Sequence, residues 1–275
     1  MKEVNCITIY DVSDEAVILY SSESVVDVTG YTQEELRGKT GYCLIDPEIV
    51  CAMQAAGTRV REEDNMATVM YTSIKHKTEG LIPIESVSGR CFDIIVAVIT
   101  RADKGQPRLR ACYATSQHTY TRKNGGIMAT QDITPKYATS IIKTPPSPEP
   151  AACMILNRFT RHLTIEFATK NCEFLLGIDA RKCNGLSFLS YIDPDDLLFV
   201  TEQFENVKVS NAVAQLQFSF LSPQYRQSLP VRAAIFCAND GIILNIRLFK
   251  HEKSSNDGLV FLNFFLDGRP DLPAK

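Results

Sequence analysis

The sequence lacks any run of lysine and arginine, although 29 basic residues are spread along its 275 positions. Because 32 acidic residues outnumber them, the net charge at pH 7 is −3. Proteins that bind nucleic acid neutralise phosphates with clustered basic side chains, which give one surface a positive field. The composition therefore predicts no direct nucleic-acid binding.

Long apolar stretches are also missing. Apolar runs such as residues 94–99 and 259–262 have the length of β-strands. They are far shorter than the roughly 20 residues that a membrane-spanning helix needs. The first residues do not show the basic and then apolar pattern of a secretory signal. We therefore expect no contact with a membrane.

The nine cysteines follow no regular spacing, and no Cys-x-x-Cys pair occurs. Disulfide frameworks and zinc sites both depend on such spacing. An odd number of scattered cysteines instead favours buried free thiols in a reducing compartment. The sequence therefore predicts a cytoplasmic or nuclear protein.

Motifs for catalysis are absent as well. No Gly-x-Ser-x-Gly elbow, phosphate-binding loop or His-Glu-x-x-His pair occurs. None of the four histidines lies on a predicted helix from which it could reach a haem iron; they are His76, His118, His162 and His251. We expect no enzymatic activity, no metal and no bound cofactor.

What the sequence does contain is an internal repeat. Residues 28–47 and 175–194 share two glycines and an Ile-Asp-Pro at one constant offset of 147 positions. Gly30 and Pro47, for example, correspond to Gly177 and Pro194. This spacing exceeds the period of about 20–50 residues of solenoid repeats, so it indicates two copies of one domain.

The shared residues have local structural roles. Gly30 and Gly177 are expected to end a short helix, where a residue with positive φ satisfies the last carbonyl groups. Asp-Pro at positions 46–47 and 193–194 predicts the start of a longer helix, because Asp accepts hydrogen bonds from free N–H groups and Pro has none to offer. Strands follow in both copies, and residues 259–266 are predicted as a final apolar strand.

A strand, several short helices, a capped longer helix and a run of strands is the layout of a PAS domain. The sequence resembles the motif of that family at Gly30-Tyr31, Glu35-Leu36 and Gly38, and again in Ile-Asp-Pro-Asp-Asp at residues 192–196. The resemblance implies an α+β fold with two PAS domains, each an antiparallel sheet of five strands or slightly more with short helices on one face. The domain assignment is an N-terminal flanking segment at 1–14, PAS domains at 15–137 and 151–268, and a proline-rich linker at 138–150.

One short motif points to light sensing. Residues 171–175, Asn-Cys-Glu-Phe-Leu, resemble the Asn-Cys-Arg-Phe-Leu-Gln motif of blue-light-sensing flavin PAS domains, whose cysteine forms a photo-adduct. In that family the motif follows the second glycine of the repeat, whereas here it precedes the first, Gly177. The arginine that meets the flavin phosphate is missing too. We therefore expect no covalent flavin chemistry at Cys172.

Two functions remain open, and the first is protein interaction. The hairpin at residues 76–85 and the proline-rich linker resemble the PAS repeats of white-collar and basic-helix-loop-helix PAS transcription regulators. The resemblance implies a non-enzymatic module in signal transduction or transcription regulation, which forms a homodimer or a heterodimer with a PAS-containing protein. Such domains pair through the outer sheet face and the N-terminal flanking segment, so the candidate contact residues are Val4, Ile7, Ile9, Phe261, Phe264 and Phe265.

The second function is ligand sensing. A PAS fold can enclose an apolar pocket between helices and sheet, which would hold non-covalent flavin, haem or a small metabolite. Candidate lining residues in the second copy are Phe188, Tyr191, Phe199, Phe218 and Phe236. Large aromatic side chains at several lining positions favour a packed interior, so we rank interaction above sensing.

Overall fold

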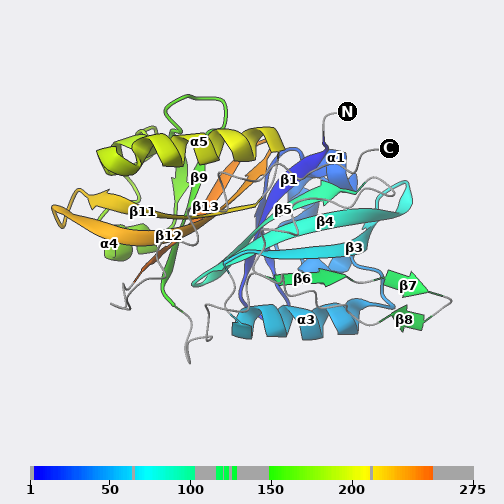
Figure 1. Cartoon of the computed structure of the whole chain (residues 1–275). Helices are drawn as coiled ribbons and strands as arrows, with labels where there is room; N and C mark the ends of the chain where they lie inside the picture. The colour runs from blue at the N-terminus through cyan, green and yellow to red at the C-terminus, as the bar shows by residue number, and fades with distance from the viewer. Residues whose placement is uncertain are drawn as a thin grey trace, which may run out of the picture.

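The computed structural model describes residues 3–63, 66–102, 116–119, 121–123, 126–128, 149–210 and 213–249. The fold is α+β, with one sheet in each copy of the repeat and the helices of that copy on one face of its sheet (Figure 1). We call the part up to residue 128 copy one and the part from residue 149 copy two. The predicted fold class, α+β with a sheet of five strands or slightly more in each copy, is confirmed.

Copy one contains a six-stranded sheet of order β2-β1-β5-β4-β3-β6. All neighbouring strands are antiparallel except β3 and β6, which are parallel. A separate small hairpin joins β7 and β8. The strands are β1 (Asn5–Asp11), β2 (Ile18–Ser21), β3 (Thr68–His76), β4 (Gly80–Cys91), β5 (Ile94–Arg101), β6 (Ser116–Thr119), β7 (Thr121–Lys123) and β8 (Gly126–Met128). The helices are α1 (Val25–Thr29), α2 (Gln33–Leu36), the 3-10 helix η1 (Gly41–Leu44) and α3 (Val50–Glu63).

Copy two contains a five-stranded antiparallel sheet of order β10-β9-β13-β12-β11. Its strands are β9 (Ala151–Leu156), β10 (Ile165–Ala168), β11 (Ala214–Ser222), β12 (Gln227–Ala238) and β13 (Gly241–Leu248). Its helices are α4 (Asn171–Leu176), the 3-10 helix η3 (Phe188–Tyr191) and α5 (Pro194–Ser210). This order reproduces the first five strands of the copy-one sheet.

The repeat extends to individual hydrogen bonds. The Ile18 N–H donates to Lys39 O at 2.8 Å, and the Ile165 N–H donates to Leu186 O at 2.9 Å. The bridge between Val17 and Thr40 likewise has a counterpart 147 residues later, between Thr164 and Ser187. The offset found in the sequence therefore describes the backbone of both copies.

The glycine prediction is confirmed at the ends of α1 and α4. Gly30 has φ +77° and Gly177 has φ +68°, and the N–H of each donates back to a helix carbonyl. Gly177 is also tightly enclosed, because a Cβ there would lie 2.5 Å from Ser222 Oγ. A side chain at this position meets both an unfavourable backbone conformation and a steric clash.

One of the two predicted helix starts is confirmed, and the other is wrong by three residues. Helix α5 begins at Pro194, as expected. Helix α3 begins only at Val50, although the Asp-Pro pair ends at Pro47. The intervening residues form a turn of their own, in which the Glu48 N–H donates to Asp46 Oδ1 at 3.1 Å and the Ile49 N–H donates to Asp46 O at 2.9 Å.

The predicted boundary at residue 14 needs correction. Strand β1, which was assigned to a flanking segment, is the second strand of the copy-one sheet and pairs with both β2 and β5. Its counterpart is β9, which pairs with β10 and β13 in the same way. Most of the proline-rich linker, residues 138–148, and the predicted strand at 259–266 lie outside the described residues.

Each copy has its own core between sheet and helices. The core of copy two is rich in phenylalanine, including Phe188, Phe204 and Phe220, all with 0% exposure. The core of copy one is aliphatic, with isoleucine at seven positions and no phenylalanine; they are Ile18, Ile45, Ile49, Ile74, Ile82, Ile84 and Ile99. No helix in the described part of the chain is long and apolar enough to span a membrane.

Candidate functional site

A third apolar cluster lies between the two sheets, on the faces that their helices do not cover. Strands β1 and β5 contact β12, and β4 contacts β9. In Figure 1 the longer helices α3 and α5 lie on opposite sides of the molecule, with the sheets between them. We call this cluster the interdomain joint; its buried residues are Ile7, Ile9, Met66, Ala67, Val69, Val87, Cys91, Val96, Val98, Ala151, Cys153, Val213, Ala234, Phe236, Ala238 and Ile243.

The joint arises from the two-residue period of the strands. Successive side chains of a strand point to opposite faces of its sheet. In β12, Ile235 and Cys237 belong to the core of copy two, whereas Ala234 and Phe236 belong to the joint. Strand β12 is therefore buried on both faces, and its outer face is covered by the other copy of the same chain.

Polar groups fix the position of the two sheets. The Asn245 side chain is 1% exposed, and its Nδ2 donates to Arg90 O at 3.0 Å and to Met66 O at 3.3 Å, both in copy one. The sheets approach closely here, since a Cβ on Gly89 of copy one would lie 3.0 Å from Asn245 Nδ2 of copy two. A buried amide with two backbone acceptors specifies one arrangement of the joint, which apolar contacts alone do not.

Buried cysteines also lie at the contact between the two copies. Cys91 Sγ of copy one donates to Ala151 O of copy two at 3.4 Å. The hydrogen bond between Cys91 and Cys153, together with burial, raises the pKa of the Cys153 thiol well above its ordinary value. A buried thiol with a raised pKa is a poor nucleophile, so Cys153 is suited to packing rather than to chemistry.

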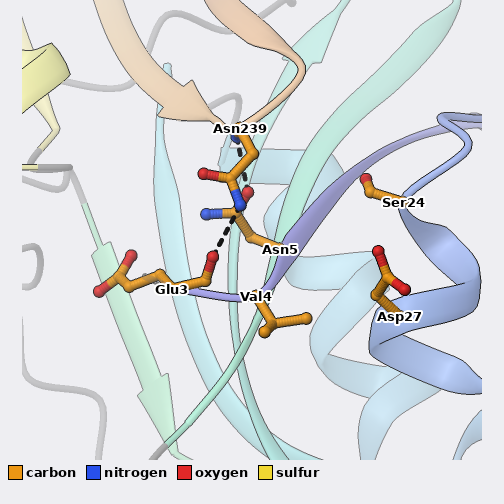
Figure 2. Close-up of a pocket in the computed structure, with 6 residues that line it drawn as sticks. All are labelled: Glu3, Val4, Asn5, Ser24, Asp27 and Asn239. Atoms are coloured by element: carbon orange, nitrogen blue, oxygen red, sulfur yellow. Dashed lines mark hydrogen bonds between the residues drawn. The ribbon is translucent and has the colours of Figure 1, made fainter. Parts of the chain in front are cut away.

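The rim of the joint is a hollow of about 410 Å³ lined by Glu3, Val4, Asn5, Ser24, Asp27 and Asn239 (Figure 2). Asn239, in the turn between β12 and β13, donates from N to Asn5 Oδ1 and from Nδ2 to Glu3 O, both at 2.7 Å. The Ser24 hydroxyl donates to the carboxylate of Asp240 in the same turn. Five of the six residues that line the hollow are polar or acidic, whereas the pocket expected for a cofactor is lined mainly by apolar side chains.

The residues predicted to contact a partner lie in different parts of the molecule. Ile7 and Ile9 lie in the joint, at 3% and 7% exposure. Val4 is 38% exposed and lines the hollow. The three phenylalanines predicted with them, Phe261, Phe264 and Phe265, lie outside the described residues.

Four of the predicted pocket residues pack together in copy two. Phe188 and Phe218 belong to its core, and Tyr191 and Phe199 pack against it. The Phe188 ring meets the Phe218 ring edge-on with centroids 6.3 Å apart, and Tyr191 stacks on Phe220 at 5.7 Å. The four side chains therefore belong to or pack against one apolar core.

The prediction for Phe236 was wrong. This residue is 1% exposed but lies in the joint, on the opposite face of the sheet from the other four. Its neighbours in sequence, Ile235 and Cys237, occupy the inner face instead. An unbroken apolar run on a strand buried on both faces gives no sign of which residues face the helices.

Cys172 also lies in the core of copy two, on α4. Its Sγ donates to Cys153 O at 3.8 Å, and burial raises the pKa of this thiol to about 12. Among the described residues, no group of three or more histidine, cysteine or acidic side chains is arranged to hold a metal ion.

Sequence analysis missed Asn245, Cys91 and Gly89, which join the two copies. One signal was available, because Asn245 interrupts the apolar run of β13. A polar residue at a buried strand position requires a hydrogen-bond partner. The sequence does not say that this partner is the backbone of the other copy.

No protein-family model matches the chain, and a search of curated proteins gave no match. Similar solved structures include the PAS domain of the quorum-sensing receptor RpfR from Cronobacter turicensis, in complex with BDSF and in another structure with C12:0. Both share 15% identity with the chain at a TM-score of 0.32, over 38% of this chain and 98% of the other. The PAS-B domain of Cycle from Drosophila melanogaster, with bound glycerol, shares 14% identity at a TM-score of 0.31, over 36% and 98% of the two chains.

Proposed function

We propose that the chain is a non-enzymatic tandem PAS module for signal transduction, whose working contact is the pairing of PAS sheets through their outer faces. The observation that carries this proposal is the interdomain joint. The joint consists of apolar side chains and buried hydrogen bonds. Such a surface is suited to recognition of another protein surface.

The partner in this proposal is a PAS-containing protein, either a second copy of this chain or another protein. In this pairing, the sheet of the partner lies against the outer sheet face of one copy. It takes the place that the other copy occupies in the joint. The joint favours such an exchange because its centre is apolar. A role in transcription regulation in the nucleus, if the chain has one, would act through this partner.

The test uses the full chain and one substitution at the centre of the joint. Ala234 is 0% exposed and lies in the joint, so Ala234→Glu places a charge between the sheets. The matched control is Ser228→Glu, because Ser228 lies on the same face of β12 but is exposed. Light scattering coupled to size exclusion gives the mass, and small-angle X-ray scattering gives the radius of gyration.

For the wild-type chain we expect a compact particle of 30.7 kDa, or a multiple of it if copies exchange. Ala234→Glu should increase the radius of gyration or shift the mass, because an unpaired buried charge costs several kcal/mol. Ser228→Glu should match the wild type. If Ala234→Glu changes neither quantity while the protein stays folded, sheet pairing is not the working contact.

The alternative function is that of a sensor for non-covalent flavin, haem or a small metabolite. It needs an enclosed apolar pocket, but Phe188, Phe218 and Tyr191 pack against other aromatic rings of the copy-two core instead. An absorption spectrum of the purified chain and mass spectrometry of any small molecule released from it distinguish the two functions. A flavin or haem band, or a co-purifying metabolite, favours the sensor, whereas a colourless protein that releases no small molecule favours the interaction module.

A further inference from the structure

The contacts in the interdomain joint follow the pattern of a two-fold axis. Because the two sheets have the same strand order, β9 is the counterpart of β1 and β12 is the counterpart of β4. In the joint, β1 contacts β12 and β4 contacts β9. Such an exchange of equivalent contacts defines an isologous interface, the kind that joins the subunits of a homodimer. The two copies therefore pair as two subunits do, although they belong to one chain.

Equivalent positions in this joint carry side chains of very different size. Gly89 lies beside Val96 in the copy-one sheet, and Phe236 lies beside Ile243 in the copy-two sheet. Both pairs are 147 residues apart, so Gly89 and Phe236 are counterparts. Gly89 is buried, and Phe236 is 1% exposed and belongs to the joint. Copy one therefore has a gap in its outer face where copy two has an aromatic ring.

The residues two positions away on the same faces show the opposite difference. Val87 and Cys91 on β4 are larger than their counterparts on β12, Ala234 and Ala238. All four are buried in the joint. The outer face of copy one thus has a gap between two larger side chains, and the outer face of copy two has a ring between two small ones. The two faces differ in shape and fit each other.

A pair of two copy-two faces has no room for both phenylalanine rings. In the joint, Gly89 faces Asn245, and even a Cβ on Gly89 would lie 3.0 Å from Asn245 Nδ2. If a second copy-two face took the place of copy one, Phe236 would stand at the position of Gly89, and its ring would overlap Asn245. Steric overlap of this kind rejects the wrong partner.

A pair of two copy-one faces lacks both the ring and a hydrogen bond. Gly89 would stand at the position of Phe236 and would leave a cavity. Val98, which is the counterpart of Asn245, would face the other sheet in its place. A valine side chain cannot donate the hydrogen bond that Asn245 Nδ2 makes to Arg90 O at 3.0 Å. Both differences weaken this pair.

We propose that the joint accepts only opposite faces, so that a copy-one face pairs with a copy-two face and never with a second copy-one face. This inference rests on the proposed function and deepens it, because it defines the partner. The partner is a second copy of this chain that pairs crosswise, with its copy two on the copy one of the first chain. Shape at the centre of the joint selects this pairing, since the size difference between Gly89 and Phe236 is met only by the opposite copy.

The test uses two full-length variants, each with one damaged face. Ala234→Glu damages the copy-two face and leaves the copy-one face intact. Val87→Glu does the reverse, because Val87 is the counterpart of Ala234 and is 1% exposed in the joint. The matched controls are Leu81→Glu and Ser228→Glu, which lie at equivalent exposed positions on the same faces of β4 and β12.

Light scattering coupled to size exclusion gives the mass of each variant alone and of the equimolar mixture. We expect 30.7 kDa for each variant alone and twice this mass for the mixture, because only the mixture contains one intact face of each kind. Pairing in the mixture should be about 100-fold tighter than self-association of either variant, since a cavity or an overlap at a buried phenylalanine weakens a contact at least that much. The mixture of the two controls should match the wild type.

Circular dichroism shows whether each variant stays folded, and Val87→Gln or Ala234→Gln replaces a charged variant that does not. If either variant alone forms a dimer through its intact face, like faces pair and this inference is overturned, while the proposed function stands. If the mixture stays monomeric, faces of separate chains do not pair. The proposed function then fails together with this inference.

Discussion

Two phenylalanines on neighbouring strands of one sheet allow a direct comparison of the joint with a core. Phe236 on β12 lies in the interdomain joint, and Phe220 on β11 lies in the core of copy two. Their exposures are 1% and 0%, so both side chains are buried to the same degree. Truncating a buried phenylalanine to alanine costs about 3–5 kcal/mol. The two substitutions should therefore remove similar amounts of stabilising free energy, but they should affect different copies of the repeat.

Phe236→Ala weakens the joint, which breaks when either copy unfolds. The unfolding free energy of copy one should then fall by about 3–5 kcal/mol. This corresponds to an increase of roughly 100- to 4,000-fold in the opening equilibrium of copy one. Phe220→Ala should lower the stability of copy two by a similar amount and leave copy one unchanged, because Phe220 contacts only the core of its own copy.

The assay is hydrogen exchange with mass spectrometry, applied to the most protected amides of each copy. The strands to compare are β5 in copy one and β13 in copy two. Phe236→Ala should accelerate exchange in both strands, and Phe220→Ala only in β13. If the β5 amides of Phe236→Ala exchange at the wild-type rate, the joint does not link the two copies energetically. The reasoning behind the proposed function then fails.

Two further predictions concern the repeat and the buried thiols. Gly177→Ala should lower the unfolding free energy, measured by chemical denaturation, more than Gly185→Ala does, since both residues have positive φ but a Cβ meets neighbouring atoms only at Gly177. We expect a loss of about 1–2 kcal/mol from the backbone conformation in each variant and a further loss of about 1–3 kcal/mol from the steric clash at Gly177. Equal losses in the two variants would refute this prediction. Burial raises the pKa of Cys172 from 9.0 to about 12, so between these pH values the unfolded chain loses a proton that the folded chain keeps. Stability should therefore fall with rising pH by up to about 1.4 kcal/mol per pH unit, and Cys172→Ala should reduce this slope in denaturation titrations above pH 9.

The sequence alone determined the features that depend on local conformation. The repeat of 147 residues, the helix ends at Gly30 and Gly177 and the start of α5 at Pro194 all follow from backbone preferences of single residues. The fold class followed from the order of these elements. In each case the signal and the structure lie within a few residues of each other, so no distant contact was needed.

Only the tertiary structure decided how the two copies meet. Strand β5 and the second half of β12 are apolar on both faces, and such runs do not show which side chains face the helices and which face another sheet. For this reason Phe236 was predicted in a pocket but lies in the joint. The hydrogen bonds of Asn245 join residues 155 and 179 positions apart, and no local pattern in a sequence specifies a partner at that distance.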